Sequence, residues 1–228
     1  MTQFVQPITP SYPAGVAGVY DYNSLKQAVQ DWNARSDVGN FIDYFIQRAE
    51  NRIYWDIFTM NKGSGVKPIE AALNGTIANG VLALPTGYLG LKYALISYAG
   101  SNTAQLERRN AEFIYTQYPD RNPAGIPGYI ARDGSNFVFG PAPDGAYTIA
   151  GIYWQRSPQL TVQNTTTWMT TSIPTILLAA CNAAIAEFNK DAQAIDTWVS
   201  DYTSQMQSFL MADRSEEQSG SAFAMVAA

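Results

Sequence analysis

The chain has 228 residues, with 46% hydrophobic and 14% charged residues, and its 14 basic and 19 acidic residues give a net charge of −5. An average domain carries about 25% charged residues, so we expect part of this surface to meet other protein. The absence of histidine excludes a Ser-His triad and the usual zinc ligand. The absence of any basic run argues against tight nucleic-acid binding.

The first 22 residues are rich in proline and aromatic residues, which predicts an extended arm rather than a helix. Because exposed aromatic area is costly in water, we expect this arm to lie against another surface. The arm has no basic start and no apolar core, so we do not expect a signal peptide.

Two helices are predicted between residues 23 and 62. Asn23 or Ser24 can cap the first and Asp37 the second, since short polar side chains accept hydrogen bonds from free helix amides. Apolar residues at helical spacing should face the interior. The expected buried positions are Leu25, Ala28, Val29 and Trp32, then Ile42, Phe45, Ala49, Ile53 and Ile57, widened by Phe41, Tyr44, Tyr54 and Phe58.

Residues 63–171 read as a β-rich segment that follows a flexible break at 61–65. Asn-Gly turns between residues 71 and 84 predict one hairpin, and a Pro-Asp-Gly turn within 136–158 predicts another. The strands of the second hairpin are apolar on both faces and carry no charge until Arg156. Strand alternation places Tyr147, Ile149 and Tyr153 on one face and Ile152 and Trp154 on the other.

Helical periodicity returns in residues 172–211, where Ser172 can cap and Pro174 fits the first turn. A break near residues 189–191 separates two helices that should pack antiparallel. The tail 212–228 loses periodicity and ends in Phe223, Met225 and Val226. The buried stripes are expected to contain Ile173, Leu177, Ala180, Ala184 and Phe188, then Ile195, Trp198, Val199, Tyr202, Met206, Phe209 and Leu210.

This order of elements predicts an α+β fold, in which an α-helical bundle carries an inserted antiparallel β domain. The predicted divisions are an N-terminal arm at 1–22, a helical domain at 23–62 and 172–211, the β insert at 63–171, and a C-terminal arm at 212–228. No internal repeat is visible. No run approaches the roughly 18 apolar residues of a membrane span, so we expect no membrane contact.

The sequence offers little for catalysis. Asp43 and Glu50 share a helix face, but a solvated face is the favoured interpretation because no partner is expected to shift their pKa values. The lone Cys181 lies in an apolar run and is predicted to be a buried, inert thiol. Trp168 among hydroxyl residues suggests glycan contact, but an irregular connection is favoured. Asp191, Asp196 and Asp201 fan around their helix, so we assign no catalytic, cofactor-binding or metal residue and expect no enzyme.

Four stretches in this order resemble the head-to-tail adaptor proteins of tailed bacteriophages, and together they span roughly residues 24–210. "VLALPTGYLGL" is similar to the family's strand-Pro-Tyr-Leu segment. "GSNFVFGPAPDGAYTIAGIYWQRSPQL" is similar to its Gly-Pro-x-Pro-x-Gly-x-Tyr hairpin, and "IPTILLAACNAAIAEFNKD" to its penultimate helix. The pattern Trp-x-x-Arg-x-Asp with Ala-Glu-x-x-Ile is matched by Trp32, Arg35, Asp37, Ala49, Glu50 and Ile53.

The resemblance implies a structural protein of the virion neck, made in the cytoplasm of the bacterial host. It implies a homo-oligomeric ring, commonly a dodecamer, that contacts neighbouring copies of itself, the portal protein and tail proteins of the nozzle or tail tube. Double-stranded DNA would pass through the lumen without specific binding, and no cofactor is implied. We expect Phe223, Met225 and Val226 to anchor on the portal. We expect Tyr147, Ile149, Tyr153 and Trp154 to contact a neighbouring subunit or the tail.

Two alternatives stay open from the residues alone. One is another structural or receptor-binding protein of the tail or baseplate, although a tail terminator would have fewer long helices. The other is a glycan hydrolase that uses two carboxylates, against which the lack of clustered acids argues.

Overall fold

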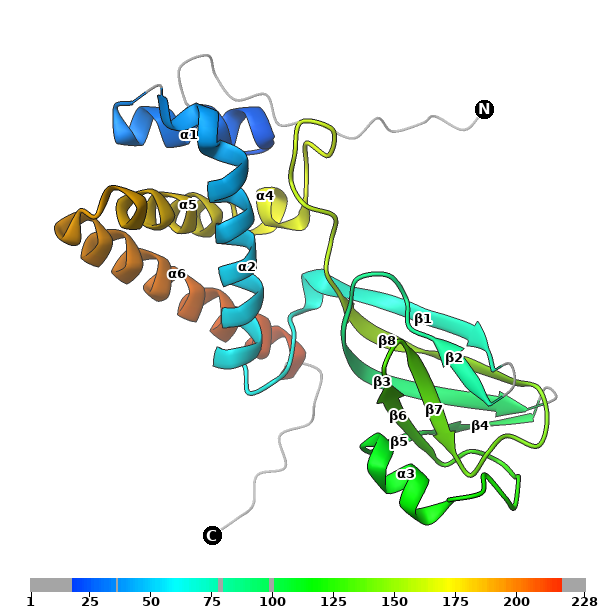
Figure 1. Ribbon diagram of the computed structural model, residues 1–228. Helices are drawn as coiled ribbons and strands as arrows, with labels where there is room; N and C mark the ends of the chain where they lie inside the picture. The colour runs from blue at the N-terminus through cyan, green and yellow to red at the C-terminus, as the bar shows by residue number, and fades with distance from the viewer. Residues whose placement is uncertain (1–17, 36, 78–79, 99–100, 219–228) are drawn as a thin grey trace, which may run out of the picture. The chain divides into compact units, whose positions relative to one another are not determined.

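The computed structural model describes residues 18–218 except for 36, 78–79 and 99–100 (Figure 1). The chain divides into two compact units. The helical unit comprises Met1–Asp56 and Pro158–Ala228, and the β unit comprises Ile57–Ser157. The predicted domain limits, with an insert at 63–171, remain a prediction, because compactness alone does not show that a segment folds independently.

The helical unit is built from α1 (Tyr22–Asn33), the 3₁₀ turn η1 (Asp37–Phe41), most of α2 (Ile42–Met60), α4 (Trp168–Ser172), α5 (Pro174–Asn189) and α6 (Ala192–Gln218). The predicted α+β class and the four long helices are confirmed. Helix α5 is apolar around most of its circumference, which is typical of a helix enclosed by others. It packs against α1, α4 and α6. Its buried residues are Ile176, Leu177, Ala179, Ala180, Cys181, Asn182, Ala183, Ala184, Ile185 and Ala186.

Helix α1 begins at Tyr22, and its N-cap lies earlier in the sequence than expected. Asp21 is the N-cap and accepts a 2.7 Å hydrogen bond from the Ser24 amide, while the Ser24 hydroxyl binds the Asp21 amide in return. The prediction of Asn23 or Ser24 as the cap was therefore wrong, because this reciprocal box satisfies two free amides together. Leu25, Ala28 and Val29 are buried as expected.

Helix α2 confirms the predicted stripe, since Ile42, Phe45, Ala49, Ile53, Ile57 and Tyr54 are all buried. Four aromatic residues predicted to join the core do not. Trp32 is 64% exposed, Phe41 53%, Tyr44 52% and Phe188 56%. These residues lie in the first or last turn of their helical segments.

Two further boundaries differ from expectation. Helix α4 lies within the predicted irregular connection, where the Thr170 hydroxyl accepts a 3.1 Å hydrogen bond from the Thr167 amide and donates to the Thr167 carbonyl at 2.9 Å. Helix α6 continues to Gln218, so the predicted arm at 212–228 is helical over its first seven residues. Alanine, arginine, glutamate and glutamine in this stretch are strong helix formers and extend α6 without a fully apolar face.

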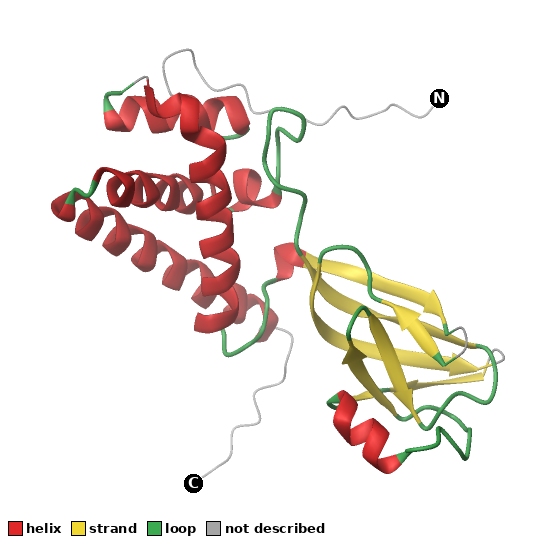
Figure 2. Cartoon of the chain, viewed as in Figure 1, coloured by secondary structure: helices red, strands yellow, loops and turns green. Residues whose placement is uncertain are grey.

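The β unit contains two four-stranded sheets (Figure 2). Their orders are β1-β8-β3-β4 and β2-β7-β6-β5. Pairing is antiparallel apart from β5 with β6, which is parallel. The strands are β1 (Glu70–Thr76), β2 (Val81–Ala83), β3 (Tyr88–Tyr98), β4 (Ser101–Gln105), β5 (Glu107–Arg108), β6 (Tyr129–Asp133), β7 (Asn136–Gly140) and β8 (Tyr147–Gln155), with the 3₁₀ turn η2 (Lys67–Ile69) before them and α3 (Ala111–Gln117) between β5 and β6.

Neither predicted hairpin forms. Strands β1 and β2 belong to different sheets, and so do β7 and β8. The turns between them carry the chain from one sheet to the other, so β1, β2 and β8 pair with strands that are distant in the sequence. The hairpin that does form in this region joins β6 to β7 through Asp133 and Asn136.

One core fills the space between the two sheets. Phe137 and Phe139 of β7 meet Tyr147 and Ile149 of β8 there, together with Tyr153. The opposite face of β7 turns Val138 toward α3, where it packs with Ile114 and Ala131. An apolar strand can thus be covered on both faces within one chain. No helix in the described ranges is long and apolar enough to cross a membrane.

Candidate interaction surfaces

The four side chains expected to contact a neighbouring subunit or the tail lie in the interior of the β unit. Tyr147, Ile149, Tyr153 and Trp154 are at most 6% exposed. The Tyr147 hydroxyl donates to Asp144 at 2.6 Å, and the Trp154 ring lies 5.8 Å from the Phe58 ring. In the free chain these are core residues rather than surface residues. A contact through them remains a prediction, and it would require them to leave the interior.

The expected portal anchor, formed by Phe223, Met225 and Val226, lies outside the described residues, as does the N-terminal arm up to residue 17. The role of these segments remains a prediction.

Exposed aromatic side chains gather where α1 and α5 end and α6 begins. Trp32 packs edge-on against Trp198 with ring centroids 5.3 Å apart. Phe188 contacts Phe41 at 6.1 Å and lies over the buried Phe45 at 5.6 Å. Aromatic residues that are half exposed yet fixed by neighbours are typical of protein contact surfaces. We call this set the helix-end patch: Trp32, Phe41, Tyr44, Phe188 and Trp198.

Polar contacts hold the helix-end patch in place. Arg35 binds Asp37 through two nitrogens at 2.6 and 3.0 Å and also donates to Asn189 at 3.2 Å. Arg48 of α2 pairs with Glu187 of α5. These contacts tie the ends of α1, α2 and α5 together, so the motif residues Arg35 and Asp37 have a structural role here.

Charge is distributed unevenly between the two units. The helical unit has six basic and thirteen acidic residues, a balance of −7, and the β unit has eight basic and six acidic residues, a balance of +2, which together give the chain's −5. Such asymmetry within one chain favours contacts between unlike surfaces.

Two arginines of the β unit, Arg108 and Arg132, lie on neighbouring strands, and we call them the arginine pair. Parallel pairing sets Arg108 of β5 opposite Ile130 of β6, and Arg132 lies two residues further along the same face. The Arg132 guanidinium sits 5.8 Å from the centre of the Tyr88 ring. Both positive charges oppose the rise in the Tyr88 pKa, which burial causes. Only the Arg132 guanidinium has a recorded contact with the Tyr88 ring in the described residues.

The contacts of the arginine pair are with main-chain oxygens. Arg108 donates to the Leu91 carbonyl at 2.5 Å, and Arg132 donates to the Gly134 carbonyl at 3.2 Å. Within the described ranges neither binds a carboxylate. By contrast, Arg109 pairs with Glu107 at 2.5 Å. Arg108 also borders a shallow groove of about 380 Å³.

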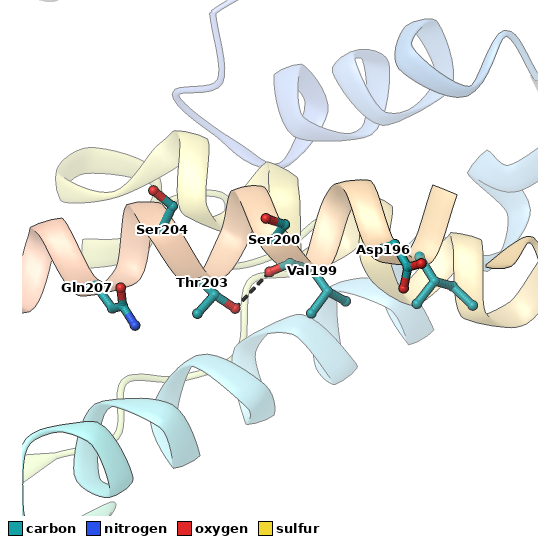
Figure 3. Close-up of a pocket in the computed structure, with 7 residues that line it drawn as sticks. Asp196, Val199, Ser200, Thr203, Ser204 and Gln207 are labelled. Atoms are coloured by element: carbon teal, nitrogen blue, oxygen red, sulfur yellow. Dashed lines mark hydrogen bonds between the residues drawn. The ribbon is translucent and has the colours of Figure 1, made fainter. Parts of the chain in front are cut away.

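A second groove, of about 450 Å³, runs along an exposed face of α6 (Figure 3). Most of the side chains that line this groove are polar. The Thr203 hydroxyl donates to the Val199 carbonyl at 2.7 Å, and the Asp196 carboxylate makes no hydrogen bond or ion pair within the described part of the chain. We call it the α6 groove, and its labelled lining residues are Asp196, Val199, Ser200, Thr203, Ser204 and Gln207.

Asp43 and Glu50, which were considered as a catalytic pair, have structural partners. Asp43 accepts a 2.8 Å hydrogen bond from the Tyr22 hydroxyl. Glu50 is 4% exposed and accepts from the Leu160 amide at 3.0 Å, so the expectation that both lie on a solvated face was wrong for Glu50. Cys181 is buried as predicted, and burial followed by the charge of Glu50 raises its pKa. No group of three metal-ligating side chains occurs within the described ranges.

Trp168 is also a packing residue rather than an exposed sugar platform. Its indole nitrogen donates to the Tyr54 hydroxyl at 3.1 Å, and its ring stacks on Phe209 at 6.4 Å.

We predict that the chain loses stability at alkaline pH through its buried tyrosines. Burial, and then the hydrogen bond to Asp43, raises the pKa of Tyr22 to about 12, against about 10 in an unfolded chain. A group whose folded pKa is raised contributes stability that is complete below the unfolded pKa and is lost as pH rises toward the folded pKa. Urea unfolding between pH 9 and 11.5 should show stability falling above pH 10.

The variant Tyr22→Phe removes that titration, so it should flatten the fall, whereas the half-exposed Tyr44→Phe should not. Equal slopes for wild type and Tyr22→Phe would contradict the prediction.

Sequence reasoning missed the arginine pair and the buried role of Glu50. Arg108 and Arg132 are 24 positions apart in the sequence, and only the parallel pairing of β5 with β6 brings them together. The Glu50 carboxylate accepts a hydrogen bond from the main-chain amide of Leu160. No pattern of side chains in the sequence predicts such a contact.

A family model described as SU10 adaptor protein matches residues 20–225. No curated protein matches the sequence significantly.

Proposed function

The chain belongs to the SU10 adaptor protein family, a family of phage adaptor proteins, and from this premise we propose that it is the head-to-tail adaptor of a tailed phage. In this role, copies of the chain form a ring beneath the portal, join the capsid to the tail and leave a channel for DNA. The family gives a structural, non-enzymatic role and binding to other virion proteins. The ring, the portal and the place in the neck are our proposal.

The observation that carries the proposal is the extent of the family match, which spans both units of the chain. The helix-end patch supports it, because a ring subunit must contact two lateral neighbours and proteins above and below. The patch offers aromatic side chains that are rigidly held and still half exposed. The acidic balance supports free passage of DNA, since clustered positive charge is what retains phosphate backbones.

The test uses the purified chain and the portal ring of the same phage, mixed at micromolar concentrations and imaged by electron microscopy. We expect a second ring stacked on the portal. Bare portals beside free chains would contradict the proposal and point to a position further down the tail.

We also propose that the C-terminal segment anchors this ring on the portal through Phe223, Met225 and Val226. Because α6 continues to Gln218, the informative truncation removes residues 219–228 only. Circular dichroism should show an unchanged fold, while binding to the portal ring should be lost, because a short apolar segment can order on its partner and supply most of the buried area.

A control keeps the length of the segment and replaces the three apolar residues by serine. Loss of binding in both variants supports the anchor. Full binding by the serine variant would show that the three side chains are dispensable.

A further inference from the structure

The arginine pair has hydrogen-bonding capacity that the described chain leaves unused. A guanidinium carries five N–H donors in a planar fork. Arg108 and Arg132 each direct a hydrogen bond to one main-chain carbonyl. Both are exposed, and within the described ranges neither touches a carboxylate. They therefore carry full positive charge with free donors at the surface.

The surroundings hold these donors in a fixed place. Tyr88, which lies beside Arg132, packs edge-on against Phe137 at 5.3 Å and stacks on Tyr153 at 6.0 Å. Both partners belong to the core between the sheets. Because the platform is rigid, less side-chain entropy is lost when a ligand binds. Paired guanidinium groups of this kind suit a planar anion, and a carboxylate is the form that proteins present.

The helical unit offers such a carboxylate without a partner. Asp191, which directly precedes α6, accepts from the Ala194 amide, and Asp201 of α6 accepts from the Gln205 side-chain amide. Asp196 has no such contact within the described part of the chain, and it lines the α6 groove beside Ser200 (Figure 3).

We infer that the arginine pair of one copy binds Asp196 in the α6 groove of a second copy. This inference rests on the proposed ring. The charges favour it, since two arginines of the unit with a balance of +2 would meet a carboxylate of the unit with a balance of −7. The two contact surfaces differ, so the contact is head to tail, and a head-to-tail contact can repeat around a closed ring.

The test reverses each side of the contact separately. Variant one is Arg108→Glu with Arg132→Glu, and variant two is Asp196→Arg. Each variant alone places like charges together, which costs several kcal/mol in an interface, so the number of copies bound per portal should fall about tenfold or more. An equal mixture should recover assembly, because glutamates of variant one meet Arg at 196 of variant two while the other contact keeps its wild-type charges.

Matched controls carry the same charge changes elsewhere. Asp201→Arg lies on a different side of α6, and Lys62→Glu with Lys67→Glu lies elsewhere in the β unit; both should assemble like the wild type. Circular dichroism verifies folding of every variant. Self-association is also measured without portal, by chemical cross-linking at high protein concentration, and the same pattern of loss and recovery is expected.

The outcomes separate this inference from the proposed function. If the wild type and both reversed variants stack on the portal equally, the inference is overturned and the adaptor role stands. If the wild type ignores the portal yet cross-links in the charge-dependent pattern, the inference stands and the portal role falls. Weakened binding of variant one to duplex DNA, with assembly unchanged, would assign the arginine pair to phosphate instead. Absence of oligomers under both conditions overturns the inference.

Discussion

Replacing Gly151 by alanine is expected to destabilise the β unit by about 3 kcal/mol or more, which is the upper end for forcing extra atoms into a packed interior. Gly151 lies in β8, between Leu73 of β1 and Ala94 of β3. An added Cβ would stand 2.3 Å from the Tyr93 carbonyl oxygen and 3.0 Å from the Ala94 Cα atom. Both are main-chain atoms of a central strand, so no side-chain rotation can relieve the clash.

Hydrogen exchange of peptides from β8 and β3 measures this effect directly, because amides of a loosened ladder exchange faster. The matched control is Gly128→Ala, where an added Cβ meets nothing within 4 Å. The pairing of β3 with β8 has an irregular register between Leu91 and Tyr93. If the amides of β8 stay protected from exchange in Gly151→Ala, then β3 can shift at this irregularity to make room.

Replacing Tyr202 by alanine should have an effect of similar size in the helical unit, about 3–5 kcal/mol for loss of a large buried side chain. Tyr202 is fully buried on α6, and its hydroxyl donates to Asp56 of α2 at 2.7 Å. Arg52 lies 4.5 Å from the centre of its ring. Tyr202→Phe keeps the ring and loses only the hydrogen bond to a charged group, so about 1.5–3 kcal/mol should remain as its cost.

Tyr115 provides the matched pair for this comparison. Its hydroxyl also donates to an aspartate, Asp133, at 2.7 Å, but the residue is exposed. Water can replace that hydrogen bond, so Tyr115→Phe should change the free energy of unfolding by less than about 0.5 kcal/mol. Urea unfolding followed by circular dichroism measures all three variants. Equal costs at positions 202 and 115 would refute the role of burial.

The helices were predictable because their information is local. Period-3.6 spacing alone identified the buried positions of α2 and the α6 residues Tyr202, Met206 and Leu210. Local spacing does not state where a neighbouring helix ends, and for this reason Trp32 and Phe41 were assigned to the core although they are exposed. The same limit hid α4, which is a single short turn closed by a threonine pair.

Strand pairing was beyond local patterns. The alternation in β8 correctly placed Tyr147, Ile149 and Tyr153 on one face, and that face is covered in the core between the sheets. Which strands pair with one another depends on residues up to about 80 positions apart in the sequence, as with Leu73 of β1 opposite Gly151 of β8. A turn signal between two strands says only that the chain changes direction, and here it also changes sheet.

The candidate surfaces divide in the same way. Low charge and abundant tyrosine pointed to protein contacts, and the family membership agrees with that. The residues first chosen for the contact, such as Tyr147 and Trp154, were chosen for being apolar, and apolarity also selects core positions. The arginine pair was chosen because it binds no carboxylate in the described chain, and Asp196 because it has no hydrogen bond or ion pair there. Only the folded chain reveals either property.

The way the chain enters and leaves the β unit bears on how that unit would carry mechanical load. Glu70 at the start of β1 pairs with Trp154 near the end of β8, so both connections leave from the same end of two adjacent strands. When tension acts between the β unit and the helical unit, both connections pull on the β unit together. The load then draws β1 and β8 in one direction and does not peel them apart. The force passes instead to the long ladder between β8 and β3, whose hydrogen bonds lie across the strands and yield only if many break at once.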